Sequence, residues 1–112
     1  MPSGWSMMWV VCTFDLPVVT KKQQREAANF RKTLLERGYS MKQYSIYVKP
    51  AGNLQQAKAM TRSLREFFPE SGHVVFYYIT DRQMLLCDEF KSTRHSENDE
   101  EKREAEHYLF DF

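Results

Sequence analysis

The stretch MMWVVCTF at residues 7–14 constrains the fold more than any other part of the chain. Its apolar residues fall on both alternating sets of positions: Met8, Val10, Cys12 and Phe14 on one, and Met7, Trp9 and Val11 on the other. A strand with this pattern is buried on both faces, as a central strand is. The apolar run stops at Asp15, which directly precedes Leu16 and Pro17. We therefore expect a central strand that ends in a carboxylate held at a turn.

Two amphipathic helices are predicted after this strand. Thr20 and Gln23 form a Thr-x-x-Gln capping box, and apolar residues recur at helical spacing until Gly38, which predicts a helix over residues 20–37. Asn53 can cap a second helix that Pro69 ends. Its expected apolar face consists of Leu54, Ala57, Met60, Thr61, Leu64, Phe67 and Phe68.

Three further segments have strand character. Residues 39–50 are rich in aromatic and β-branched residues and end at Pro50. Residues 73–80 and 83–90 are separated only by Asp81 and Arg82, which predicts a tight hairpin. A ferredoxin-like order needs two strands between the helices, so residues 39–50 would have to break near Lys42 and Gln43. Periodicity leaves one strand or two open.

Length and composition indicate one globular domain. The chain has 112 residues, 42% of them hydrophobic, and we expect a domain over residues 1–90 followed by an acidic spacer and an apolar tail over 91–112. No apolar run approaches the ~18 residues of a membrane span, and the N-terminus lacks the basic residues of a secretory signal. We expect a cytoplasmic protein, in which Cys12 and Cys87 are small buried hydrophobes.

Asp15 is the leading candidate for chemistry. A lone aspartate before Leu-Pro is commonly a turn or capping residue. However, two helices on one side of a sheet leave the second apolar face of the first strand uncovered, and a second copy of the chain could cover it. Two Asp15 side chains could then approach the two-fold axis and hold Mg²⁺ or another divalent cation together with substrate phosphates. A metal held there would support phosphodiester hydrolysis, with Asp15 as the catalytic residue.

Basic side chains are available for a nucleic-acid backbone. Residues 1–90 hold 12 Lys and Arg against 8 Asp and Glu, whereas residues 91–112 hold 4 against 7. The helical cations offer phosphate contacts without reading base sequence. The candidates for nucleic-acid binding are Lys21, Lys22, Arg25, Arg31, Lys32, Arg62 and Arg65. The histidines at 73, 95 and 107 lack ligand spacing, so no metal role is expected for them.

Four segments together resemble the Cas-two family of CRISPR-associated proteins: WVVCTFDLP, the basic helix to LLERGY, QYSIYVKP, and HVVFYYITDRQ. The resemblance implies an α+β ferredoxin-like sandwich, with an antiparallel sheet, two helices on one face and a short extra strand around residues 38–42. It also implies a sheet-to-sheet homodimer with metal near the paired Asp15 residues. The implied activities are nuclease action on RNA or DNA, and a scaffold role in which the dimer bridges two dimers of the Cas-one integrase and supports the prespacer duplex.

Residue by residue, Asp15 matches the metal-binding acid of that family, and Arg25 and Arg31 match its helix-borne basic residues. For the tail we expect a swapped strand or an integrase-docking segment, with a tail that stays mobile as the alternative, and the expected partner-binding residues are Tyr108, Leu109, Phe110 and Phe112. Two alternatives remain open at this point. One is a VapD-like toxin ribonuclease, and the other is a non-catalytic ferredoxin-like RNA-binding module that uses the aromatics of residues 73–80.

Overall fold

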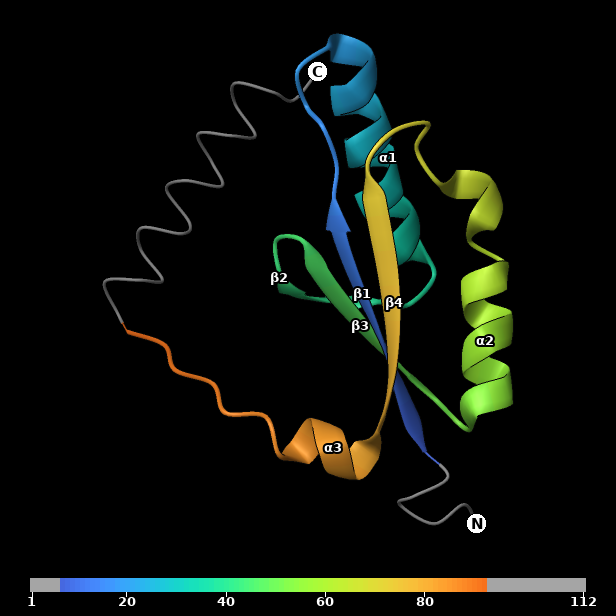
Figure 1. Ribbon diagram of the computed structural model, residues 1–112, viewed down its shortest axis with the longest axis vertical. Coiled ribbons are helices and arrows are strands. Elements are labelled where there is room, and N and C mark those ends of the chain that lie inside the picture. The colour runs from blue at the N-terminus through green and yellow to red at the C-terminus, as the bar shows by residue number, and fades with distance from the viewer. Residues whose placement is uncertain (1–6, 93–112) are drawn as a thin grey trace.

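The computed structural model describes residues 7–92 and shows a four-stranded sheet with two long helices on one face (Figure 1). All strand pairs are antiparallel, and the strand order is β2-β3-β1-β4. The elements are β1 (Met8–Asp15), α1 (Lys21–Glu36), β2 (Ser40–Gln43), β3 (Ile46–Ala51), α2 (Leu54–Arg62), the 3-10 helix η1 (Arg65–Phe67), β4 (His73–Thr80) and α3 (Asp81–Leu85). The predicted α+β ferredoxin-like fold is confirmed.

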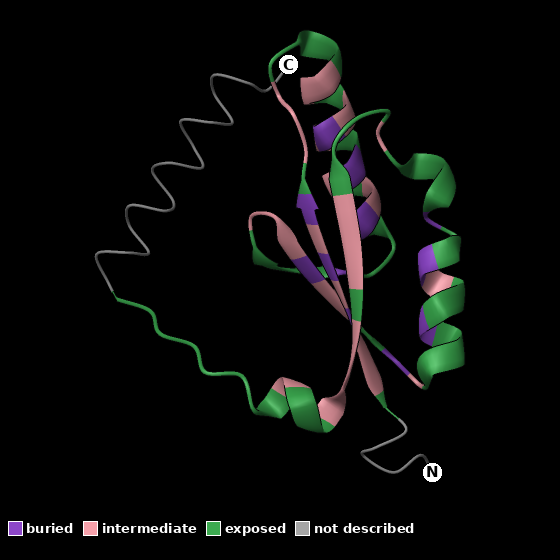
Figure 2. Ribbon diagram, viewed as in Figure 1, coloured by how far each residue is buried: buried purple, intermediate pink, exposed green. Residues whose placement is uncertain are grey.

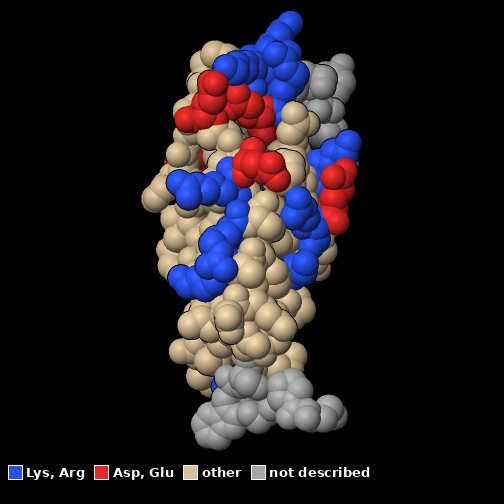
Figure 3. Space-filling view, turned by 90° about the vertical axis from the view of Figure 1, so that its right-hand side faces the viewer, with Lys and Arg blue, Asp and Glu red and all other residues tan. Residues whose placement is uncertain are grey.

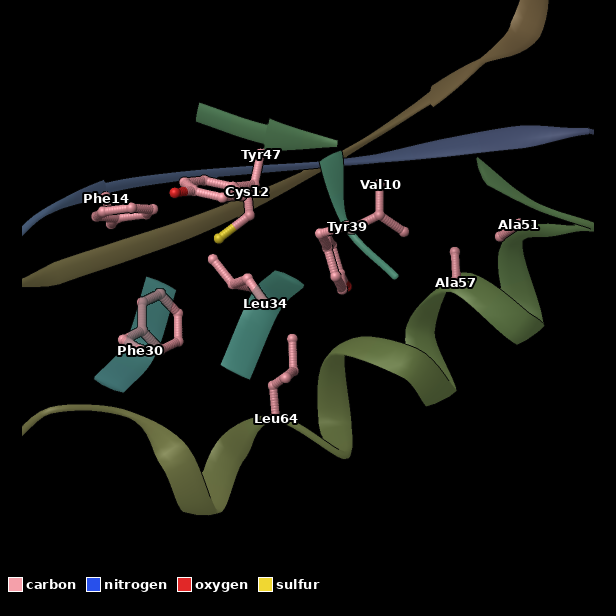
Figure 4. Close-up of a cluster of buried hydrophobic side chains, with 10 residues drawn as sticks. All are labelled: Val10, Cys12, Phe14, Phe30, Leu34, Tyr39, Tyr47, Ala51, Ala57 and Leu64. Carbon is pink, nitrogen blue, oxygen red and sulfur yellow. The ribbon is translucent and has the colours of Figure 1, made fainter. Parts of the chain in front are cut away.

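The core lies between one face of the sheet and helices α1 and α2 (Figure 4). Val10, Cys12 and Phe14 project from β1 into this layer and are buried. The Phe14 ring meets Phe30 of α1 edge-on, with centroids 5.4 Å apart, and stacks on Tyr47 of β3 at 5.7 Å. Because each large apolar side chain contributes about 1.5–3 kcal/mol when buried, this cluster fixes which face of β1 turns toward the helices.

The opposite face of the sheet, here called the open face, lies under neither α1 nor α2. Its side chains belong to Trp9, Val11, Thr13, Asp15, Ile46, Val48, His73, Val75, Tyr77 and Ile79. Most are half-buried, the class drawn in pink in Figure 2. Tyr77 is 53% exposed. Among residues 7–92, β1 is therefore fully buried on one face only.

The first predicted helix is confirmed by α1 and its caps. Thr20 accepts a hydrogen bond from the Gln23 backbone N–H at 3.1 Å, and the Gln23 side chain accepts one from the Thr20 N–H at 3.1 Å. After the helix, Gly38 has φ +88°, and the Tyr39 N–H donates to the Leu34 carbonyl at 2.9 Å. These contacts satisfy the end groups of the helix.

The second helix is shorter than predicted. α2 ends at Arg62, and a separate 3-10 turn follows at residues 65–67. The Ser63 hydroxyl donates to the Met60 carbonyl at 2.7 Å, a side-chain contact that competes with the regular helical ladder. Of the predicted apolar face, Ala57, Thr61 and Leu64 are buried, whereas Leu54, Phe67 and Phe68 are exposed.

Residues 39–50 form two strands, as the family resemblance implies. β2 covers Ser40–Gln43 and β3 covers Ile46–Ala51, joined by a turn at Tyr44 and Ser45. The order of elements up to Thr80 is therefore β-α-β-β-α-β, which answers the question that periodicity left open.

The predicted strand at residues 83–90 and its hairpin are wrong. Thr80 and Gln83 form a second capping box, in which Thr80 Oγ1 accepts from the Gln83 N–H at 3.1 Å and Gln83 Oε1 accepts from the Thr80 N–H at 2.8 Å. This cap starts helix α3, and residues 86–92 follow without regular structure. Cys87 is consequently exposed, so its predicted burial is also wrong, whereas Cys12 is buried as expected.

Two polar contacts fasten the chain after β4 to the sheet. Trp9 Nε1 donates to Asp81 Oδ1 at 2.8 Å, at the start of α3. Lys42 Nζ lies 2.7 Å from Glu89 Oε2. The predicted domain boundary at residue 90 stays a prediction, and the predicted tail residues Tyr108, Leu109, Phe110 and Phe112 lie outside the described residues.

Candidate metal and nucleic-acid site

Asp15 is the last residue of β1 and lies on the open face. The Phe14 N–H donates to the carbonyl of Ser45, in the turn before β3, at 3.1 Å, and Leu16 and Pro17 then lead the chain away. The Asp15 side chain is exposed. Within residues 7–92 its carboxylate accepts no hydrogen bond and forms no ion pair, so the turn-capping interpretation gains no support there.

His73 is the cross-strand partner of Asp15. The register of β1 and β4 pairs Asp15 with His73 and the preceding Phe14 with Val74. Directly paired residues of an antiparallel sheet project from the same face, so both side chains lie on the open face, and both are exposed. Sequence spacing assigned His73 no site role, because only the strand register brings the two residues together.

Gly72 holds the two strand ends close together. It has φ +112°, and a Cβ added there would lie 2.9 Å from the Asp15 carbonyl oxygen and 2.7 Å from Leu16 Cδ2. Only glycine permits this approach and backbone angle without strain. The start of β4 is therefore packed directly against the backbone that carries Asp15.

The donor set at this end of the sheet suits a divalent cation that keeps open coordination positions. An exposed carboxylate is the ligand type that Mg²⁺ accepts, with waters and substrate phosphates as its other ligands. No group of three or more His, Cys, Asp and Glu side chains with metal-binding geometry occurs among the described residues. A cation at Asp15 would therefore need some of its ligands from solvent, from a substrate or from a second chain.

Arg31, a predicted nucleic-acid contact, packs against the same end of the sheet. Its guanidinium lies 4.1 Å from the Tyr44 ring centroid and 5.3 Å from that of Phe14, and its Nε donates to the Tyr44 carbonyl at 3.5 Å. A cation–π contact of this kind contributes about 0.5–2 kcal/mol. Arg31 thus braces the β2–β3 turn that pairs with the end of β1.

The other predicted nucleic-acid residues divide into two groups. Lys22 forms ion pairs with Glu70 at 2.8 Å and Glu26 at 4.0 Å, and Lys32 lies 3.9 Å from Glu36. The hydrogen bond to Glu70 raises the pKa of Lys22, and the same contact lowers the pKa of Glu70. Four cations form no ion pair with any described residue: Lys21, Arg25, Arg62 and Arg65.

Charge is mixed on the molecular face that carries α2. Figure 3 shows lysine and arginine side chains interleaved with acidic ones toward the upper end of this face, with uncharged surface below. Such a surface offers separate phosphate contacts rather than one continuous basic patch.

Comparison with known proteins identifies the family. The sequence model of the family described as CRISPR associated protein Cas2 matches residues 8–85, which span every described helix and strand. A CRISPR-associated endoribonuclease Cas2 of Flavobacterium psychrophilum is 34% identical over 99 residues, or 88% of this chain and 86% of its own length. The CRISPR-associated endoribonuclease Cas2 2 of Rhodospirillum rubrum is 40% identical over 85 residues, 76% of each chain.

A third relative, the CRISPR-associated endoribonuclease Cas2 of Parvibaculum lavamentivorans, is 41% identical over 76 residues, which cover 68% of this chain and 75% of that protein. Within residues 7–92, no helix has both the length and the apolar character needed to cross a bilayer. This chain belongs to the Cas2 family of CRISPR-associated proteins.

Proposed function

We propose that the chain is a CRISPR adaptation protein that acts as a homodimer, bridges Cas-one integrase dimers and binds prespacer duplex DNA for spacer integration. We further propose that Asp15 supports divalent-cation-dependent hydrolysis of RNA or DNA. The descriptions of the relatives name them endoribonucleases, which cleave RNA. The observation that carries the proposal is the apolar sheet face that neither α1 nor α2 covers, with an exposed Asp15 at its end, in a chain of this family.

The open face supports the proposed homodimer. Trp9, Val11, Val48 and Ile79 form an apolar surface that neither α1 nor α2 covers. Contiguous apolar surface of this kind on a soluble protein marks an interface. A second copy presents an identical sheet, and an isologous pairing of two such faces closes without leaving an open end.

The dimer can be tested with a charge in the open face. Val11→Lys places an ammonium at the centre of the proposed interface and should give a monomer in sedimentation velocity, with its helix content unchanged by circular dichroism. Val19→Lys is the matched control, because Val19 is 87% exposed before α1 and should leave the dimer intact. A Val11→Lys protein that sediments as the wild type does would contradict the sheet-to-sheet pairing.

The metal proposal concerns the Asp15 carboxylate. Mg²⁺ or another divalent cation held there would polarise a phosphoryl oxygen and lower the pKa of an attacking water. The contribution of this chain is to hold the carboxylate at a rigid strand end, and in a dimer two such ends would share one substrate backbone. The unpaired cations Lys21, Arg25, Arg62 and Arg65 would hold phosphates without reading base sequence.

The decisive experiment separates scaffold from nuclease. The full chain is co-purified with a Cas-one integrase and assayed for spacer integration and for Mg²⁺-dependent cleavage, with wild type, Asp15→Asn and Asp88→Asn in parallel. Asp15→Asn should keep integrase binding and lose cleavage, whereas Asp88→Asn, which removes an exposed carboxylate outside the strands, should keep both. Unchanged cleavage by purified Asp15→Asn would reject the metal assignment, and failure of the wild type to bind the integrase would reject the scaffold.

The apolar tail is proposed to dock on the integrase. Deleting residues 91–112 removes Tyr108, Leu109, Phe110 and Phe112 together with the acidic spacer. The truncated protein should bind the integrase more weakly in a titration, and equal affinity would reject a docking role for the tail.

A further inference from the structure

We propose that Asp15 and His73 together form a mixed oxygen and nitrogen cation site, and that this site binds Mn²⁺ more tightly than Mg²⁺. The inference rests on the proposed function, because it concerns the same Asp15 site, and adds to it a second ligand and a metal preference.

The first argument is the strand register. Asp15 and His73 are direct cross-strand partners at the end of the β1–β4 ladder, and the next pair inward, Phe14 and Val74, packs into the helix-facing core. A slip of one residue would turn the buried Phe14 out of the core. The core therefore fixes the Asp15–His73 pair on the open face.

The second argument is the close packing that supports the pair. The Gly72 backbone lies so near the Asp15 carbonyl that a Cβ added at Gly72 would approach that oxygen to 2.9 Å. Both ends of the site are thus backbone segments in direct contact, one carrying the carboxylate and the other the imidazole. Preorganised ligands of this kind are what a weak surface site needs.

The third argument is reach. Directly paired residues in an antiparallel sheet have Cβ atoms about 4.5–5.5 Å apart. Ligand distances to a first-row divalent ion such as zinc are about 2.0–2.2 Å for carboxylate oxygen and imidazole nitrogen. One ion can therefore bridge a carboxylate and an imidazole at that separation. Both side chains are exposed, so water and phosphate can take the other coordination positions.

The preference for Mn²⁺ follows from the ligand types. Mg²⁺ is a hard cation that favours oxygen ligands and keeps several of its waters. Imidazole nitrogen favours transition metals, whereas Mn²⁺ also accepts carboxylate and water. A site with one oxygen and one nitrogen ligand therefore gains more with Mn²⁺ than with Mg²⁺.

The test measures binding directly, on full-length protein without a histidine tag. Mn²⁺ and Mg²⁺ affinities are measured by calorimetry, and coordinated nitrogen is detected as ¹⁴N modulation of the Mn²⁺ electron spin echo. The wild type should show the ¹⁴N signal and bind Mn²⁺ more tightly than Mg²⁺. His73→Gln should remove the signal and weaken Mn²⁺ binding about tenfold or more, since even indirect disturbance of a ligand costs about 10–100-fold, with Mg²⁺ affinity changed less than about twofold.

Two further variants make the outcome specific. The chain has three histidines, so His95→Gln combined with His107→Gln leaves His73 as the only imidazole and should keep the ¹⁴N signal. Asp88→Asn removes a carboxylate away from the strands and should bind both ions as the wild type does.

The two proposals fail in different ways. The inference about His73 would be overturned if His73→Gln bound Mn²⁺ as tightly as the wild type, or if the His95/His107 double variant lost the ¹⁴N signal. In either case, a loss of metal binding in Asp15→Asn would still support the Asp15 site. Wild-type binding in Asp15→Asn would overturn both the Asp15 metal site and the inference. Integrase binding is measured separately, and its outcome tests the scaffold proposal independently of the metal site.

Discussion

Replacing Gly72 with alanine should destabilise the protein strongly, because a side chain there meets backbone on one side and a core side chain on the other. The new Cβ would lie 2.7 Å from Leu16 Cδ2, 2.9 Å from the Asp15 carbonyl oxygen and 3.1 Å from Leu16 Cα, at φ +112°. The left-handed backbone costs a non-glycine residue about 1–2 kcal/mol, and forced overpacking costs about 1–3 kcal/mol. We expect a loss of about 2–5 kcal/mol in the free energy of unfolding.

Gly38 provides the matched control. It also has a positive φ, +88°, but the three atoms nearest to a Cβ there belong to the flexible Lys49 side chain, the first at 3.4 Å. Gly38→Ala should therefore cost only the backbone part, about 1–2 kcal/mol. The difference between the two variants isolates the close approach between the start of β4 and the end of β1.

Urea unfolding followed by circular dichroism measures both variants. With a slope of about 1–3 kcal/mol per M of urea, a 3 kcal/mol loss lowers the unfolding midpoint by about 1–3 M. All proteins must be compared at one chain concentration, because the stability of a dimer depends on it. A Gly72→Ala midpoint equal to that of Gly38→Ala would refute the reasoning from steric contact.

Three further outcomes are expected. Burial raises the pKa of the Cys12 thiol to about 12. At pH 8 a thiol reagent should therefore modify only the exposed Cys87 in the native protein, and both cysteines in denaturant. Two fast-reacting thiols in the native protein would contradict the burial of Cys12. Tyr39→Phe should leave the thermal unfolding midpoint unchanged or raised, since the buried Tyr39 hydroxyl has no hydrogen-bond partner among the described residues. Hydrogen bonds from Lys42 and Lys91 hold the pKa of Glu89 below its usual range. The ionised Glu89 therefore stabilises the folded chain above about pH 4.3, and this stabilisation is lost as pH falls through the lowered pKa. A carboxyl NMR titration should show the depressed pKa of Glu89, and Lys42→Gln should raise that pKa.

Local signals were enough to predict β1 and α1. An unbroken apolar run and a complete capping box each specify an element without reference to the rest of the chain. The break between β2 and β3 carries no such signal, because Tyr44 and Ser45 include neither glycine nor proline. It is held by tertiary contacts, the Arg31 guanidinium over Tyr44 and the Phe14 N–H on the Ser45 carbonyl.

The error at α3 has a different origin. The apolar run after Gln83 resembles a strand, but the capping box of Thr80 and Gln83 has the same form as the one that begins α1. Giving the cap priority over a short apolar run would have predicted the helix. The pairing of Asp15 with His73 is different again, because it depends on the register between strands far apart in sequence, which no local pattern encodes.

The Trp9 indole is a fluorophore on the open face, and its hydrogen bond to Asp81 fixes its position there. The chain has two tryptophans, and replacing Trp5 with phenylalanine leaves the half-buried Trp9 indole as the sole tryptophan, anchored through its Nε1 at the start of α3. Indole emission shifts to shorter wavelength when water is removed from the ring. The emission wavelength of Trp9 can thus report dissociation on dilution, partner binding and detachment of α3 at one known position on the sheet, with no added label.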